Sequence, residues 1–179
     1  MFSSIKNIFL KKYLAENKPN RQKQIVPLSR AKNIAMLCEI THEDSYKDIF
    51  RLFTQLQEHG HNVKLIGYID EKEVPFYCLP QLAADYFCQK NLNWYGKPNM
   101  EQIQDFVKED YDMLIDFNYR YHPAVMSLLS MSRAKFIVGR VSDCQPVYDL
   151  FIGAADKDSN VKFLENVSVY TQKLSGNGN

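Results

Sequence analysis

The sequence predicts a three-layer, Rossmann-like α/β fold built on a doubly wound, mainly parallel sheet of five or six strands. Short apolar runs alternate along the chain with segments whose apolar residues recur every three or four positions, and this alternation is typical of strands and helices in βαβ units. The first run, 34–40, is almost unbroken in apolarity, as expected for a strand covered on both faces. The length of 179 residues suits one such domain.

The first half of the domain is predicted to run strand, helix, strand. After 34–40, the residues from Thr41 to Ser45 are of the capping type, so a helix begins there. Its apolar stripe comprises Ile49, Phe50, Phe53 and Leu56. Gly60 is a natural residue to end this helix, and 63–69 is the second strand.

The stretch 74–98 contains two strand-like runs, 74–79 and 84–89, with Pro80 between them. We assign 84–89 as the third strand. Asn99, with Gln102 three residues later, resembles a capping box and predicts the start of the next helix. The apolar face of that helix comprises Met100, Ile103, Phe106 and Val107.

The second half repeats the pattern. The fourth strand is 112–117, Pro123 suits the first turn of the next helix, 136–141 is the fifth strand and 147–152 a sixth. A last helix carries Phe163, Val167, Tyr170 and Leu174. Right-handed crossovers then give the order 3-2-1-4-5, in which ligands bind at the carboxyl ends of strands one and four.

The N-terminal part of the chain differs in charge from the rest. Up to Lys32 there are eight basic residues and one acidic residue, a net charge of +7, and since the whole chain carries +1 the remainder carries −6. We therefore divide the chain into a basic helical arm and linker (1–32), one Rossmann-like domain (33–174) and a disordered tail (175–179). The polar stretch 16–30 is either a linker or an arm wrapped over the surface.

The arm begins with a predicted basic amphipathic helix, because Phe2, Ile5, Phe9 and Tyr13 recur at helical spacing with lysines around them. Three interpretations of this helix stay open: packing on its own domain or on a second subunit or protein partner, binding to an anionic membrane surface, and binding to nucleic acid. Nucleic acid is the least favoured, since the body is acidic and the arm has no recognised binding motif.

Location and cofactors are predicted from what the sequence lacks. The N-terminus has no signal-peptide pattern and no later run is apolar over about 18 residues, so we expect a cytoplasmic protein. The cysteines are scattered without a CxxC pair, which favours reduced structural thiols: Cys38, Cys78, Cys88 and Cys144. Neither GxGxxG nor GxxxxGK[ST] occurs, and we expect no cofactor.

Two segments carry a family resemblance. Residues 111–118, YDMLIDFN, and 128–139, LLSMSRAKFIVG, resemble a segment in the N-terminal half of lipopolysaccharide heptosyltransferases, two-domain glycosyltransferases of the GT-B fold. The whole chain also resembles short bacterial proteins of unknown function that join a basic N-terminal helix to this segment. The resemblance implies a Rossmann-like domain.

The resemblance is incomplete. In heptosyltransferases the first strand ends in a glycine-containing loop with a catalytic-base aspartate. Here the loop 40–45 has no glycine, and the resemblance implies Asp44 as the candidate for the position of that base. Those enzymes bind the nucleotide sugar mainly in a second domain, for which this sequence has no room, so we do not expect complete glycosyltransferase activity.

Polar residues are predicted to gather where strands one and four end. The candidate catalytic residues are Asp44, Asp116, His42 and His122, since imidazole and carboxylate groups perform acid–base catalysis. The candidate ligand-binding residues are Thr41, Ser45, Asn118, Arg120 and Arg140. A metal site built from His42, His122 and Asp116 has no local spacing to support it, and none is predicted. The alternative is that these loop tips are solvated and that Asp116 caps the following turn.

Three functions therefore stay open. The leading interpretation is a non-catalytic or degenerate binding or interaction module, which forms a homodimer or meets a protein partner through the N-terminal helix. A transferase or hydrolase acting in the crevice between strands one and four is the second. A membrane-surface accessory factor is the third.

Overall fold

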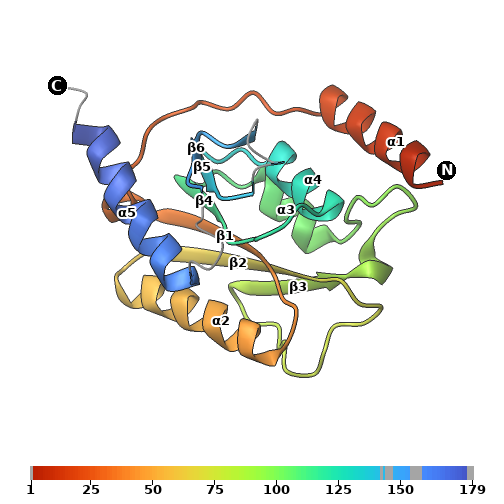
Figure 1. Cartoon of the computed structure of the whole chain (residues 1–179), viewed down its shortest axis with the longest axis horizontal. Helices are drawn as coiled ribbons and strands as arrows, with labels where there is room; N and C mark the ends of the chain where they lie inside the picture. Colours follow the sequence, from red (N-terminus) through yellow and green to blue (C-terminus); the bar gives the residue numbers. More distant parts are fainter. Residues whose placement is uncertain (1, 142, 144–146, 154–158, 177–179) are drawn as a thin grey trace.

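The computed structural model describes residues 2–141, 143, 147–153 and 159–176. These residues form a six-stranded sheet in the order β3-β2-β1-β4-β5-β6, in which every pairing is parallel (Figure 1). The predicted three-layer α/β fold and the order of its first five strands are confirmed. The strands are β1 (Asn33–Glu39), β2 (Asn62–Ile69), β3 (Ala84–Cys88), β4 (Met113–Asp116), β5 (Phe136–Gly139) and β6 (Leu150–Phe151). The α-helices are α1 (Phe2–Glu16), α2 (Glu43–Glu58), α3 (Glu101–Lys108), α4 (Pro123–Met131) and α5 (Asn160–Gly176).

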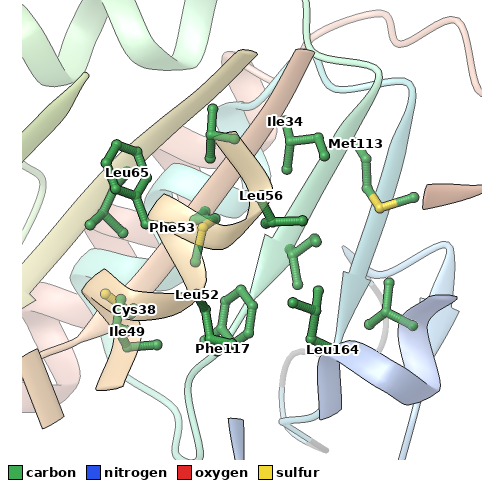
Figure 2. Packing of buried hydrophobic residues seen from close by; sticks show 14 of the residues in the cluster. Ile34, Cys38, Ile49, Leu52, Phe53, Leu56, Leu65, Met113, Phe117 and Leu164 are labelled. Atoms are coloured by element: carbon green, nitrogen blue, oxygen red, sulfur yellow. The ribbon is translucent and has the colours of Figure 1, made fainter. Parts of the chain in front are cut away.

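Helices cover both faces of the sheet because the central strands are apolar on both sides. Along β1, Met36 and Cys38 pack toward α2 and α5, whereas Ala35 and Leu37 pack toward α3 and α4. Figure 2 shows the first of these two cores, in which the stripe of α2 meets β1, β2 and β4. Parallel strands buried on both faces are therefore the reason for the near-continuous apolar runs.

Helix α2 begins and ends where the sequence predicts. Ser45 Oγ accepts hydrogen bonds from the backbone N–H groups of Thr41 (3.0 Å) and His42 (3.1 Å), which closes the first turn. At the other end Gly60 has φ +89°, and the N–H groups of Gly60 and His61 donate to the carbonyls of Gln57 and Leu56. Glycine adopts this left-handed conformation without strain.

The arm wraps the domain from one face to the other (Figure 1). Helix α1 lies against α4. Arg21 Nε then donates to the carbonyl of Ala134 (2.8 Å), and both Arg21 and Lys23 pair with Asp149 ahead of β6. Farther on, Leu28 enters the core beneath α5. Of the two alternatives for 16–30, the structure therefore has the wrapped arm.

The face that α1 buries differs from the predicted stripe. Leu10 is buried, and Tyr13 is half-buried against the α3–α4 core. Ile5 and Phe9, two members of the predicted stripe, are exposed instead. The helix is apolar on two sides, and periodicity alone does not say which side meets the domain.

The third strand lies at Ala84–Cys88, as assigned, and the other strand-like run, 74–79, forms no strand. Three further details depart from the sequence-based expectations. Strand β2 connects to β3 through turns without a helix. Helix α3 begins after Met100 rather than Asn99, because the Asn99 N–H donates to the carbonyl of Asn91 (2.8 Å) and stays in the loop. Helix α5 continues to Gly176, past the predicted start of the tail. Cys144 and residues 177–179 lie outside the described residues.

Candidate functional site

A cleft of about 590 Å³ opens at the carboxyl ends of β1 and β4, between the first residues of α2 and α5. The sheet reverses its winding direction here, since β1 connects to β2 on one side and β4 to β5 on the other. Six of the predicted site residues line this cleft, which we call the α2–α5 cleft: Thr41, His42, Asp44, Ser45, Asn118 and Arg120. Four that the sequence analysis did not single out also line it: Glu39, Asp48, Tyr119 and Asn160.

The α2 side of the cleft consists of capping groups and carboxylates. Ser45 Oγ is engaged in hydrogen bonds within the first turn of α2, where it also donates to the carbonyl of His42 (2.7 Å). Thr41 Oγ1 lies 3.0 Å from His42 Nδ1. Asp44 stands exposed in the first turn, where a carboxylate interacts favourably with the helix dipole. This side therefore offers hydrogen-bond acceptors and negative charge.

Asp48 extends this side across the cleft. Its carboxylate accepts from Arg51 Nη2 (3.0 Å) and, more weakly, from Asn160 Nδ2 (3.4 Å) at the start of α5. Asp48 lies one helical turn after Asp44, so both carboxylates share one face of α2. This i, i+4 spacing is the signal by which the sequence identifies Asp48 as a cleft residue.

Arg120 forms the opposite rim and is anchored by an ion pair. Its Nε donates to Glu39 Oε2 (2.9 Å) and its Nη2 donates to Oε1 of the same carboxylate. The side chain of Arg120 is 64% exposed and that of Glu39 is 7% exposed. This carboxylate raises the pKa of Arg120. The guanidinium is thus held at the rim, with most of its charge offset by Glu39.

Asp116 does not reach the cleft. It is fully buried and points toward the α3–α4 side of β4, since its strand neighbours Ile115 and Phe117 belong to the opposite core. Its carboxylate accepts hydrogen bonds from the hydroxyl of Tyr148 and from the backbone N–H (3.1 Å) and side-chain amide of Asn118. Burial raises the pKa of Asp116, although these donors oppose the shift.

Tyr148 reaches Asp116 only because residue 139 is a glycine. A Cβ atom at Gly139 would lie 2.1 Å from Cζ of the Tyr148 ring, far inside contact distance. The glycine at the end of β5 is therefore required by close packing, and its backbone angle plays no part.

Arg140 lies beneath the cleft rather than in it. It is 5% exposed, with its guanidinium stacked between the rings of Tyr119 (3.6 Å) and Phe163 (4.5 Å). It donates to the carbonyls of Phe117 (2.6 Å) and Asn118 (3.2 Å) and to Asn160 Oδ1 (2.5 Å). Arg140 therefore fastens the loop after β4 to the first turn of α5. We call this set the buried polar cluster: Asp116, Asn118, Arg140, Tyr148 and Asn160. Two of its members, Asn118 and Asn160, also line the cleft.

His122 belongs to a different cleft. Its ring packs on Tyr68 (4.3 Å between centroids), its Nδ1 accepts from the N–H of Ala124 (3.2 Å), and its Nε2 lies 3.7 Å from Asp70. Burial lowers the pKa of His122, and the charge of Asp70 opposes this shift. Here it caps α4 and faces a cleft of about 430 Å³ beside α1 that shares no lining residue with the α2–α5 cleft.

The four candidate catalytic residues are therefore distributed over three places. His42 and Asp44 line the α2–α5 cleft, Asp116 is sealed in the buried polar cluster, and His122 faces the second cleft. Among the ligand-binding candidates, Arg140 is likewise internal. Their roles stay predictions. The structure places hydrogen-bond acceptors on the α2 side of the cleft and Arg120 at the opposite rim. The buried polar cluster lies beneath them.

Thiols and metal-ligand sets add little chemistry to this site. Cys38 lines the cleft floor, but burial raises the pKa of its thiol well above the usual range, which disfavours the reactive thiolate. Burial also raises the pKa of Cys78 to about 11. Within the described residues, no group of three or more His, Cys, Asp or Glu side chains is placed to hold a metal ion.

Comparison with known proteins places the chain in one family. Residues 5–174 match the model of DUF6913, a family of unknown function, so the chain belongs to that family. No curated protein and no solved structure matches it. Among the described residues, none of the helices combines the length and the apolarity needed to cross a membrane.

Proposed function

We propose that the protein is a non-catalytic binding module and that the α2–α5 cleft holds its ligand. The observation that carries this proposal is that two of the four candidate catalytic residues lie outside the cleft, which keeps only His42 and Asp44. Asp116 is fully buried and engaged by three donors, and His122 faces another cleft. Proton transfer needs the acid or base within hydrogen-bond reach of the reacting group.

The chemistry of the cleft wall favours a hydroxyl-rich ligand that is neutral or cationic. The polar groups on the α2 side of the cleft are mainly acceptors. They are the carboxylates of the exposed Asp44 and the half-buried Asp48 on the helix, and the hydroxyl of Thr41 just before it. Carboxylates form strong hydrogen bonds with hydroxyl and ammonium donors. A phosphate is disfavoured, because Glu43 and Asp44 already occupy the first turn of α2 and would repel it.

The resemblance to the N-terminal half of heptosyltransferases supports the same class of ligand. The two segments that carry it, 111–118 and 128–139, include β4 and β5, and the first of them contributes Phe117 and Asn118 to the cleft lining. A domain of this kind that has kept a sugar-sized, hydroxyl-binding cleft without a catalytic constellation is the degenerate module that we propose.

A ligand-observed NMR screen of the full chain tests the proposal. Three panels are used: neutral sugars and polyols, amino sugars, and sugar phosphates. We expect binding from the first two panels and little from the third. Replacing both Asp44 and Asp48 by alanine removes charged hydrogen-bond acceptors, so affinity for the bound compounds should fall roughly tenfold or more.

Asp105→Ala is the matched control, because Asp105 is an exposed acid on α3, outside the cleft. It should leave binding unchanged. A preference for the sugar phosphates would contradict the ligand class. Conversion of any bound compound by the wild-type protein, followed in the same spectra, would contradict the non-catalytic role.

A further inference from the structure

Helix α1 has a second apolar face that the domain leaves uncovered. Leu10 points into the protein, whereas Ile5, Ile8 and Phe9 are exposed, Ile8 to 64%. These three residues are spaced three and four apart and so form one stripe along the helix. The stripe faces away from α4, since the buried Leu10 lies on the other side of the helix.

Trp94 continues this stripe beyond the helix. Its ring lies edge-on to Phe9, with 4.9 Å between centroids, and Trp94 is 56% exposed. It comes from the loop after β3, so two separate segments of the chain contribute to one apolar surface. We call this surface the α1 patch: Ile5, Ile8, Phe9 and Trp94.

Lysines surround the α1 patch. Lys6, Lys11 and Lys12 are all exposed on α1, and residues 1–15 contain no acidic residue. Lys12 approaches Glu16 only to 3.9 Å, and both side chains are more than half exposed, so water and salt screen this pair. The patch therefore combines exposed apolar side chains with a net positive charge.

We infer that the α1 patch docks the protein on an anionic lipid surface, with α1 lying in the plane of the membrane. Apolar side chains between lysines match the boundary between acyl chains and anionic headgroups. A tryptophan at the edge of such a patch suits this boundary, because its ring is apolar and its N–H is polar. Because α1 lies against the domain, the helix docks without inserting across the bilayer.

Charge argues against a second copy of α1 as the occupant. Two α1 patches facing each other would bring six lysines together with no acid in the first fifteen residues of either chain. Like charges at such short range repel. On an anionic membrane, the headgroups pair with the lysines while the apolar stripe contacts the acyl chains.

The chain itself supplies the probe, because Trp94 is its only tryptophan. Trp94 fluorescence is recorded while the full chain is titrated with vesicles of equimolar phosphatidylglycerol and phosphatidylcholine, and separately with pure phosphatidylcholine. We expect a blue shift and co-sedimentation with the anionic vesicles only. Both should weaken on the order of tenfold when salt screens the lysines.

Two variants separate the apolar and the charged contributions. Ile5→Ser with Ile8→Ser removes apolar area and should weaken vesicle binding on the order of tenfold or more. Lys11→Glu with Lys12→Glu reverses charge and should abolish the blue shift. Leu82→Ser is the control, because Leu82 is fully exposed in the β2–β3 connection, and it should bind as the wild type does.

Three results would overturn the inference. Wild-type protein that fails to co-sediment with anionic vesicles is the first, and equal binding to pure phosphatidylcholine is the second. The third is a dimer of the wild type, seen by light scattering, that the Ile5 and Ile8 substitutions dissociate, since a second copy would then occupy the patch.

Discussion

The cleft wall and the buried polar cluster use the same residue types in opposite ways, as Arg120 and Arg140 show. Arg120 is 64% exposed and forms an ion pair with one carboxylate at the rim. Arg140 is 5% exposed and donates hydrogen bonds to two backbone carbonyls and a side-chain amide. Removing an exposed group returns its partner to water, while removing a buried one leaves its partners without hydrogen bonds. The exposed polar groups of the cleft wall can therefore contact a ligand, whereas the buried groups of the cluster are engaged with the protein itself.

The largest expected difference is between Arg140→Met and Arg120→Met. Arg140→Met removes the donor that the carbonyls of Phe117 and Asn118 share and leaves Asn160 Oδ1 with the Tyr119 hydroxyl (3.2 Å), and it also removes a buried positive charge near Asp116. The free energy of unfolding should fall by about 3–5 kcal/mol. Arg120→Met removes an arginine that is 64% exposed from a carboxylate that is 7% exposed. Water can take the place of the guanidinium at the rim, so this substitution should cost less, about 1–2 kcal/mol. Urea denaturation of both variants checks this, and equal losses would remove the distinction between cluster and wall.

A smaller effect is expected from Gly139→Ala. The added Cβ would overlap the Tyr148 ring, so the ring must move away from Asp116, at a cost of about 1–3 kcal/mol. Gly153→Ala is the matched control, because its Cβ would meet Phe151 at an ordinary 3.5 Å. Thermal unfolding compares the two. An unchanged melting temperature for Gly139→Ala would show that Tyr148 does not depend on this space.

The third effect is a pH dependence. Burial raises the pKa of Asp116 above its unfolded value of about 3.9, so the folded protein binds this proton more tightly than the unfolded chain. The contribution of Asp116 to stability is therefore greatest at low pH and is lost as the pH rises through the folded pKa. Asp116→Asn removes this titration.

Denaturation of the wild type and Asp116→Asn at a series of pH values from about 4 upward measures this effect. The difference in unfolding free energy should shift steadily in favour of Asp116→Asn as the pH rises. Asp149 acts in the opposite sense, because its bonds to Arg21 and Lys23 outweigh burial and lower its pKa, but it is common to both proteins and cancels. A difference that is independent of pH would contradict the raised pKa.

The fold was predictable because strands that are buried on both faces of the sheet appear in the sequence as nearly continuous apolar runs. The apolar runs of β1, β2 and β4 and the stripe of α2 all lie where the pattern indicates. The residues of the cleft wall on α2 were predictable in part, since strand ends and helix starts carry recognisable polar residues. Asp48 follows Asp44 by one helical turn, so the same reasoning could have predicted it as a cleft residue.

The division between wall and cluster was not predictable, because it depends on the direction of single side chains. Asp116 is the last residue of β4, and one position in a strand decides which face of the sheet a side chain meets. Arg140 and Arg120 both come after the carboxyl end of a strand, β5 and β4 respectively, so their positions in the sequence do not show which of them is buried. Only the packing of Tyr119 and Phe163 around its guanidinium makes it internal.

The measurement that tests the central claim most directly is ligand binding by Asp116→Asn, in the same NMR screen and beside the wild type. If Asp116 belongs to the buried polar cluster and the cleft only binds, the variant folds, holds the same compounds with unchanged affinity, and neither protein converts them. A folded Asp116→Asn protein that loses binding, or that stops a conversion carried out by the wild type, would show instead that Asp116 serves the cleft.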